Sequence, residues 1–123
     1  MTKLTPKAAG TFAIAPTPFH DDGRIDDKSI DRLTDFYAEV GCDGVTVLGI
    51  LGEAPKLDAA EAEQVAVRFV KRAKTMQIIV GVSAPGFATM RSLALKSMDA
   101  GAAGVMIAPP PHLRTDDQIT GYF

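Results

Sequence analysis

The chain has 123 residues, 46% of them hydrophobic and 23% charged, and a formal net charge of −2. These values indicate one ordinary globular domain. Acidic and basic residues are interspersed, and no apolar run approaches the roughly 18 residues that cross a bilayer, so we expect no nucleic-acid partner and no membrane partner. Cys42 is the only cysteine, and the first residues lack the apolar core of a signal peptide. These features exclude an internal disulfide and predict a cytoplasmic protein.

The first half of the chain alternates between strand-like and helix-like patterns. We expect residues 1–9 to be a flexible N-terminal extension. Residues 11–15 form a short apolar run that prolines stop, which predicts a buried strand. Residues 26–40 carry apolar side chains at helical spacing, and Gly41 is well placed to end that helix. Residues 43–49 predict a second buried strand.

The second half repeats this alternation. Asp58 and Glu61 form the capping-box pattern D-x-x-E, which predicts a helix with an apolar stripe that reaches Ala73. The basic residues of this region predict a solvated helix face; they are Arg68, Lys71, Arg72 and Lys74. The remaining predicted elements are a strand, a helix, a strand and the start of a helix, at residues 77–82, 88–100, 103–108 and 115–117.

A repeated sequence pattern indicates the size of the repeating unit. The pattern G-x-x-G-V-x-[VI] occurs at residues 41–47 and again at residues 101–107, 60 residues later, with two strand–helix units between the copies. Eight units of about 30 residues make the roughly 250 residues of a (β/α)8 barrel. We therefore predict an α/β fold in which residues 1–123 form the N-terminal half of a single TIM-barrel domain, about its first four β/α units. An open doubly wound sheet is the alternative.

The end of the second strand is the most distinctive candidate binding segment, because parallel α/β folds bind ligands at the carboxyl ends of their strands. It reads Gly49-Ile50-Leu51-Gly52-Glu53. The glycines would let successive backbone amides converge on a carboxylate or a phosphate. The other interpretation is a tight turn in which Ile50 and Leu51 pack inward. We expect Glu53 to accept backbone N–H bonds that fix this loop.

Three segments together resemble the dihydrodipicolinate synthase / N-acetylneuraminate lyase family, the class I aldolases that use pyruvate. The segments are APTPF with the acidic turn after it, GCDGVTVLGILGEAPKLDAAE, and GVSAPGFATMRSLALKSMDAGAAGVMIAPP. The resemblance implies a TIM-barrel enzyme without a cofactor, in which a lysine forms a Schiff base with a 2-keto acid. It also implies a homo-oligomer, a dimer or tetramer, in the full-length form. The Schiff-base lysine and the main catalytic tyrosine are expected beyond Phe123, so this chain alone is expected to be inactive.

The resemblance also assigns roles to residues of the chain. The family's G-[TS]-T-G-E falls on Gly49 to Glu53, which implies that a substrate carboxylate binds at Gly49, Ile50, Leu51 and Gly52. The amides of Ile50 and Leu51 can make these bonds, but neither side chain has the family's hydroxyl group. The family's P-Y-Y falls on residues 109–111, which are prolines here, so both departures affect one proton relay.

His112 follows these prolines and is a candidate replacement proton donor, because an unperturbed histidine titrates near pH 6.5. A surface histidine after a proline turn is the other interpretation. His20, in an Asp-rich turn, is expected to face solvent, and Cys42 is expected to be a small buried apolar residue. No His/Cys/Asp cluster has the spacing of metal ligands, so no metal site is expected.

These observations lead to two functional hypotheses. The first is a carbon–carbon or carbon–oxygen lyase or aldolase that acts on a pyruvate-like 2-keto acid through a Schiff base and is divergent from true dihydrodipicolinate synthase. The small-molecule 2-keto acid is then its partner. The second is a truncated or non-catalytic relative that acts as a binding or assembly module.

Overall fold

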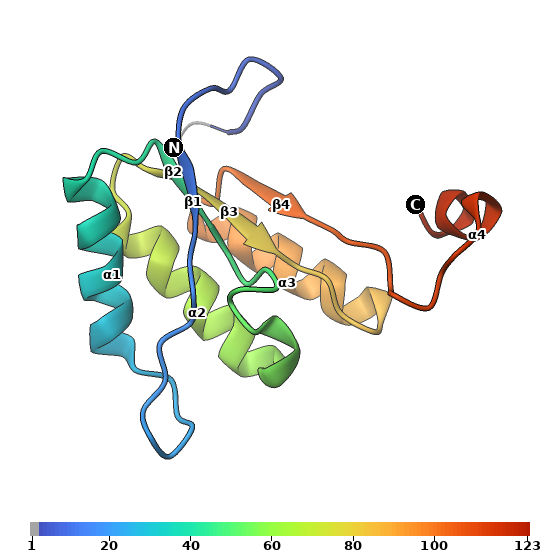
Figure 1. Cartoon of the computed structure of the whole chain (residues 1–123), viewed down its shortest axis with the longest axis horizontal. Helices are drawn as coiled ribbons and strands as arrows, with labels where there is room; N and C mark the ends of the chain where they lie inside the picture. The colour runs from blue at the N-terminus through green and yellow to red at the C-terminus, as the bar shows by residue number, and fades with distance from the viewer. Residues whose placement is uncertain (1–2) are drawn as a thin grey trace.

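A parallel sheet of four strands forms the centre of the computed structural model, which describes residues 3–123 (Figure 1). The strands are β1 (Phe12–Ile14), β2 (Gly44–Val47), β3 (Gln77–Gly81) and β4 (Gly104–Met106). They lie side by side in chain order, and each is paired in parallel with the next. A doubly wound sheet reverses its strand order at a switch point. The described strands do not, so the structure agrees with the predicted succession of barrel units.

Helices connect the strands. They are α1 (Asp27–Glu39), η1 (Ala54–Lys56), α2 (Ala59–Arg72), α3 (Phe87–Ala100) and α4 (Asp116–Tyr122). The predicted capping box is confirmed, because Asp58 accepts a hydrogen bond from the Glu61 amide while the Glu61 side chain accepts one from the Asp58 amide. The predicted helix end at Gly41 is confirmed too: Gly41 has φ +82° and directly follows the cap residue of α1.

The two faces of the sheet have different environments. Helices α1, α2 and α3 cover one face (Figure 1), where residues of β2 and β3 and the residue after β3 are fully buried: Val45, Val47, Ile78, Val80 and Val82. On the opposite face lie Ile14 of β1, which is 57% exposed, and Met106 of β4, which is also exposed. Burial on both faces is the usual state of parallel strands. The second face of this sheet is therefore the side that the remaining units of a barrel would cover.

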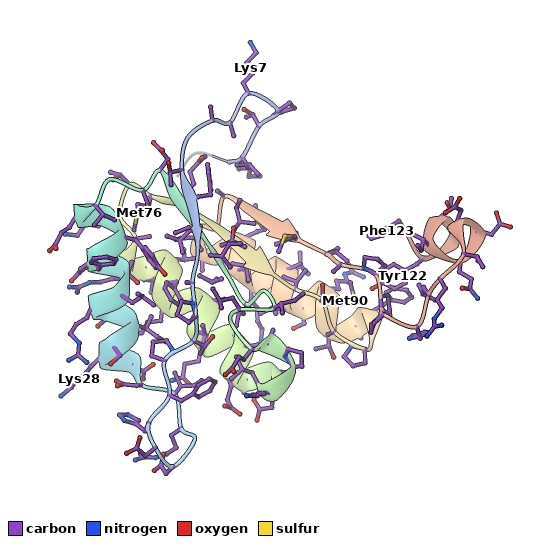
Figure 2. All side chains as sticks on the ribbon, viewed as in Figure 1. Lys7, Lys28, Met76, Met90, Tyr122 and Phe123 are labelled. Atoms are coloured by element: carbon purple, nitrogen blue, oxygen red, sulfur yellow. The ribbon has the colours of Figure 1, made fainter. Side chains whose placement is uncertain are left out.

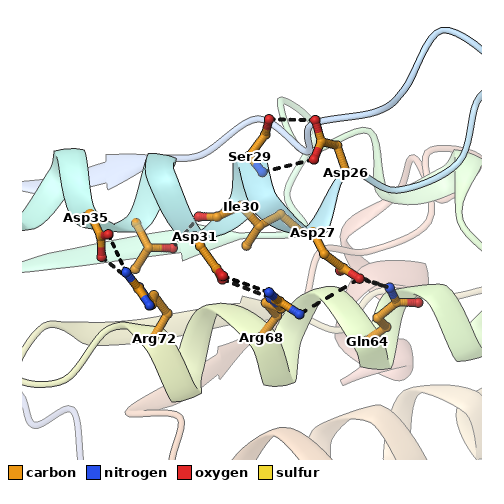
Figure 3. Close-up of polar contacts among 10 residues, drawn as sticks. Asp26, Asp27, Ser29, Ile30, Asp31, Asp35, Gln64, Arg68 and Arg72 are labelled. Carbon is orange, nitrogen blue, oxygen red and sulfur yellow. Dashed lines mark hydrogen bonds and ion pairs between the residues drawn. The ribbon is translucent and has the colours of Figure 1, made fainter.

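Three rungs of polar contacts join α1 to α2 (Figure 3). Arg68 forms a two-point pair with Asp31 at 2.8 and 2.7 Å, and Arg72 forms the same kind of pair with Asp35 at 2.8 and 2.6 Å. The third rung joins the Gln64 side-chain amide to the Asp27 carboxylate at 3.0 Å. Arg72 is exposed, as the predicted solvated face requires, and Arg68 is half-buried; the sequence did not predict that α1 lies alongside α2 and supplies a carboxylate to each.

The two lysines of that basic region have different positions. Lys74 lies beyond the end of α2, in a left-handed conformation with φ 53°, so it is not part of a helix face. Lys71 remains exposed on the last turn of α2, as predicted.

The chain ends are described only in part. Residues 1 and 2 of the predicted flexible extension lie outside the described residues. Within the rest of that extension, the Leu4 amide donates a hydrogen bond of 2.8 Å to the Ala103 carbonyl just before β4. At the other end, α4 stands apart from the sheet (Figure 1), and the Tyr122 hydroxyl donates to the Met90 sulfur of α3 at 3.3 Å (Figure 2). Both contacts join segments that are distant in sequence.

The rungs between α1 and α2 predict a pH-dependent stability. Hydrogen bonds from Arg68 and Arg72 hold the pKa values of Asp31 and Asp35 below the usual carboxyl range. Their stabilising contribution is therefore complete above the ordinary carboxyl pKa of about 4 and is lost as pH falls through the lower folded-state values. We expect the Asp31→Asn, Asp35→Asn double variant of the full-length protein to have a lower Tm than wild type near pH 7.

This Tm difference should shrink as the pH is lowered toward about 3, where the wild-type pairs are also lost. Thermal unfolding followed by circular dichroism at both pH values measures the difference. Asp99→Asn is the control, because Asp99 is exposed on α3 and makes no ion pair within residues 3–123. A Tm difference that is the same at both pH values would contradict the assignment.

Candidate functional site

Residues 48–53, here called the 48–53 loop, leave the carboxyl end of β2 and lead into η1. This is the segment that the sequence singles out for binding. At the same end of the sheet, the Ala108 amide donates a 2.8 Å hydrogen bond to the Ser83 hydroxyl, which ties the connection after β3 to the connection after β4. The segments that follow β3 and β4 are thus joined to one another at this end of the sheet.

The backbone of the 48–53 loop is unusual at two residues that are not glycine. Leu48 has φ 58° and Glu53 has φ 54°, whereas Gly49 and Gly52 have no positive φ. The left-handed conformations of this turn are thus taken by Leu48 and Glu53, and the expected role of the two glycines in binding an anion stays a prediction. Residues with a side chain are uncommon in this left-handed region, and such positions cluster at functional sites.

Glycines are required here for space. A Cβ on Gly52 would lie 3.0 Å from the Leu48 nitrogen, so a side chain at this position would require the loop backbone to shift. A Cβ on Gly81 of β3 would overlap the Leu48 carbonyl oxygen. The chain therefore passes directly over β3 as it leaves β2, and Gly81 provides the room for that passage.

The apolar pair between the two loop glycines faces outward. Ile50 is 98% exposed and Leu51 is 56% exposed, so the inward-packing interpretation is wrong for the described chain. Leu48 takes the buried position instead and is only 3% exposed. Its left-handed backbone turns its side chain into the core and directs the next residues away from it.

Several neighbouring amides of the 48–53 loop have no hydrogen-bond acceptor within the described residues. The Glu53 amide donates to the Ile50 carbonyl at 3.0 Å, which closes a turn around residues 50–53. The amides of Gly49, Ile50, Leu51 and Gly52 have no acceptor within residues 3–123. Backbone amides are strong donors, so neighbouring amides without a protein acceptor at a strand end can bind a ligand carboxylate.

The Glu53 side chain does not have the predicted role. Its carboxylate accepts a hydrogen bond of 3.0 Å from the Lys56 ammonium group, and it makes no capping hydrogen bond at the start of η1. Because Lys56 lies three residues later in the same turn, it competes successfully for this carboxylate. The loop is held by a different residue.

Thr17 holds the loop, and the sequence reasoning missed it. Thr17 lies in the connection after β1, is 7% exposed, and donates its hydroxyl hydrogen to the Gly52 carbonyl at 2.6 Å. A threonine between two prolines was the available signal, because a polar residue in so rigid a segment after a buried strand requires a buried partner.

The remaining predicted candidates lie elsewhere. His112 is exposed in the turn before α4, and its role stays a prediction. His20 is exposed as predicted, with its Nδ1 atom 3.9 Å from the Asp26 carboxylate, and Cys42 is half-buried against the core. No group of His, Cys, Asp and Glu that could hold a metal ion is found within residues 3–123. Over the same residues, no helix is long and apolar enough to cross a membrane.

Comparison with known sequences places this loop in a family. The sequence profile of the dihydrodipicolinate synthetase family matches residues 7–121. The chain belongs to this family. Among characterised relatives, the 4-hydroxy-tetrahydrodipicolinate synthases of Persephonella marina and Chlorobium luteolum are 36% and 32% identical over 118 and 115 residues. Each alignment covers 93% of this chain, but only 39% and 38% of the relative.

Solved structures of the family confirm the fold. A dihydrodipicolinate synthase from Rhodopseudomonas palustris is 85% identical, with a TM-score of 0.94, over 99% of this chain and 40% of that one. The N-acetylneuraminate lyase of Proteus mirabilis is 25% identical, with a TM-score of 0.82, over 91% of this chain and 40% of that one. The chain thus spans about two fifths of the length of these family members and forms about the first four β/α units of their TIM barrel.

The passage of the loop over β3 gives a stability prediction. In the Gly81→Ala variant, the new Cβ overlaps the Leu48 carbonyl, and the backbone must move to relieve the contact. We expect the free energy of unfolding to fall by about 1–3 kcal/mol, with a lower Tm in the full-length protein. Gly121→Ala is the control, because a Cβ there meets open space on α4 and alanine favours a helix. Equal Tm values for Gly81→Ala and wild type would refute this account.

Proposed function

We propose that the full-length protein is a carbon–carbon or carbon–oxygen lyase or aldolase that acts on a pyruvate-like 2-keto acid through a Schiff base. In this proposal the present chain supplies the substrate's carboxylate-binding loop at Gly49, Ile50, Leu51 and Gly52. The observation that carries the proposal is the pair of neighbouring amides, those of Ile50 and Leu51, that lack an acceptor within residues 3–123. They follow the carboxyl end of β2, and active sites of barrel enzymes lie at that end of the strands.

The names of the family relatives support the substrate class. They are 4-hydroxy-tetrahydrodipicolinate synthases, a dihydrodipicolinate synthase and an N-acetylneuraminate lyase. The family resemblance implies a Schiff-base lysine on a later strand, and this chain covers only about two fifths of its relatives. We therefore place the lysine and the main tyrosine in the remaining units and expect residues 1–123 alone to be inactive. We also expect the full-length enzyme to be a homo-oligomer.

In the proposed reaction, the two parts of the barrel have different roles. The lysine amine adds to the keto carbon, and loss of water from the adduct gives an imine. The protonated imine then accepts the electron pair of the neighbouring bond as that bond breaks. The 48–53 loop contributes by binding, because hydrogen bonds from amides to a charged carboxylate are stronger than those to a neutral acceptor. It thereby fixes the keto carbon in front of the lysine.

The two exposed apolar side chains support a divergent substrate preference. Ile50 and Leu51 offer no hydroxyl group beside the bound carboxylate, and residues 109–111 are prolines where the family pattern has tyrosines. We propose that the enzyme accepts a more apolar 2-keto acid and uses less of the family's proton relay, with His112 as a candidate proton donor. No observation favours the non-catalytic alternative.

Trapping of the imine tests the reaction class. Incubation of the full-length protein with pyruvate and borohydride should reduce the imine to a stable amine on one lysine, which mass spectrometry detects and locates. The modified lysine should lie outside residues 1–123. Incubation without pyruvate is the control. Absence of an adduct at saturating pyruvate, or an adduct only on surface lysines of this chain, would overturn the proposal.

Substitution of the apolar pair tests the assignment of the loop. In the Ile50→Thr, Leu51→Thr double variant, hydroxyl groups replace the apolar surface while the backbone amides remain. We expect the ratio of kcat/KM for an alkyl-substituted 2-keto acid to that for pyruvate to fall about tenfold, the size of effect that one or two apolar groups have on specificity. Val40→Thr, an exposed change at the end of α1, is the matched control. An unchanged ratio would mean that the loop does not face the substrate.

A further inference from the structure

Thr17 stands in a segment whose backbone has little freedom. Proline residues precede and follow it, which fixes the backbone on both sides and favours an extended conformation at Thr17 itself. The next residues form a closed turn, in which the Asp26 amide donates to the Pro18 carbonyl at 3.0 Å and the His20 amide donates to the Arg24 carbonyl at 2.7 Å. The hydroxyl of Thr17 is therefore held in place before it meets the 48–53 loop.

The contact of Thr17 with the loop passes through two peptide groups. Its hydroxyl donates to the Gly52 carbonyl, and the amide of the same peptide group, that of Glu53, donates to the Ile50 carbonyl. The structure has no cis peptide bond, so the carbonyl and the amide of each peptide group point in opposite directions. The bond to Gly52 therefore directs the Glu53 amide toward Ile50.

The second peptide group, between Ile50 and Leu51, determines the direction of the Leu51 amide. The carbonyl of Ile50 belongs to the same peptide group as the Leu51 amide. Because that carbonyl is held by the Glu53 amide, the Leu51 N–H points the opposite way, away from the turn. The Leu51 amide has no acceptor within residues 3–123, so it is the open end of a chain of hydrogen bonds that begins at Thr17. Bonds in such chains polarise one another.

We propose that Thr17 is a positioning residue that orients the Leu51 amide for the substrate carboxylate through the Gly52–Glu53 and Ile50–Leu51 peptide groups. This inference rests on the proposed function, because it assigns the Leu51 amide to carboxylate binding. Thr17 is buried beneath the loop and donates its hydroxyl hydrogen to Gly52, so it acts on the substrate only through the loop. Loss of the hydroxyl should therefore weaken binding of the 2-keto acid without removing the reactive lysine.

The test uses borohydride trapping of the full-length protein over a range of pyruvate concentrations. Thr17→Val keeps the shape of the side chain and removes the hydroxyl group. We expect the half-saturating pyruvate concentration to rise about tenfold, the effect of losing one hydrogen bond, while the fraction labelled at saturation stays as in wild type. Thr17→Ser restores the hydroxyl and should restore the half-saturating concentration.

A matched control comes from α1. Thr34 is 1% exposed and donates its hydroxyl to the Ile30 carbonyl at 2.7 Å, so Thr34→Val removes a buried bond of the same kind away from the loop. It should leave the half-saturating concentration unchanged. An equal rise in Thr34→Val, no rise in Thr17→Val, or a Thr17→Val protein that is unfolded or labelled to a lower maximum would overturn the positioning role. A wild-type protein that forms no adduct would instead refute the proposed function itself.

Discussion

The close passage of the Leu48 backbone over Gly81 sets the geometry of everything that follows β2. At this point the chain must bury one large side chain, turn out of the sheet and cross the neighbouring strand. It does so with a left-handed residue that has a side chain, a conformation that costs about 1–3 kcal/mol unless its surroundings hold it. The core around Leu48 and the missing side chain at Gly81 provide that support. The outward direction of residues 49–53 is a consequence of this turn.

The loop that results is held from two sides with different kinds of interaction. Packing and the absence of a Cβ fix its start at β3, whereas a hydrogen bond from Thr17 fixes its end at the connection after β1. Three consecutive strands therefore contribute to one short segment. A binding group that must stay in place during a reaction gains from such support, because small displacements of donors reduce transition-state stabilisation strongly. The exposed side chains between these two contacts can therefore differ without disturbing the loop backbone.

The sequence predicted what depends on neighbouring residues and missed what depends on distant ones. The capping box at Asp58 and Glu61 and the helix end at Gly41 are local patterns, and both were predicted correctly. The bond between Thr17 and Gly52 spans 35 residues; the prolines around Thr17 mark the residue as unusual, but no local pattern identifies its partner. The partners of Arg68 and Arg72 could not be predicted, because the relative placement of α1 and α2 follows from the sheet. The close approach at Gly52 could not be predicted either, because it depends on where the backbone of Leu48 lies.

The rungs between α1 and α2 limit where residues can be inserted into the chain. Every rung joins residues 37 positions apart, and successive rungs lie four residues apart on both helices. One residue inserted between Gln64 and Arg68 would rotate the rest of α2 by about 100° relative to α1 and separate the later rungs together. An insertion in the connection between the helices changes the common offset and leaves the facing residues aligned. Length variation among relatives should therefore fall in connections such as residues 53–57 and be absent from these two helices.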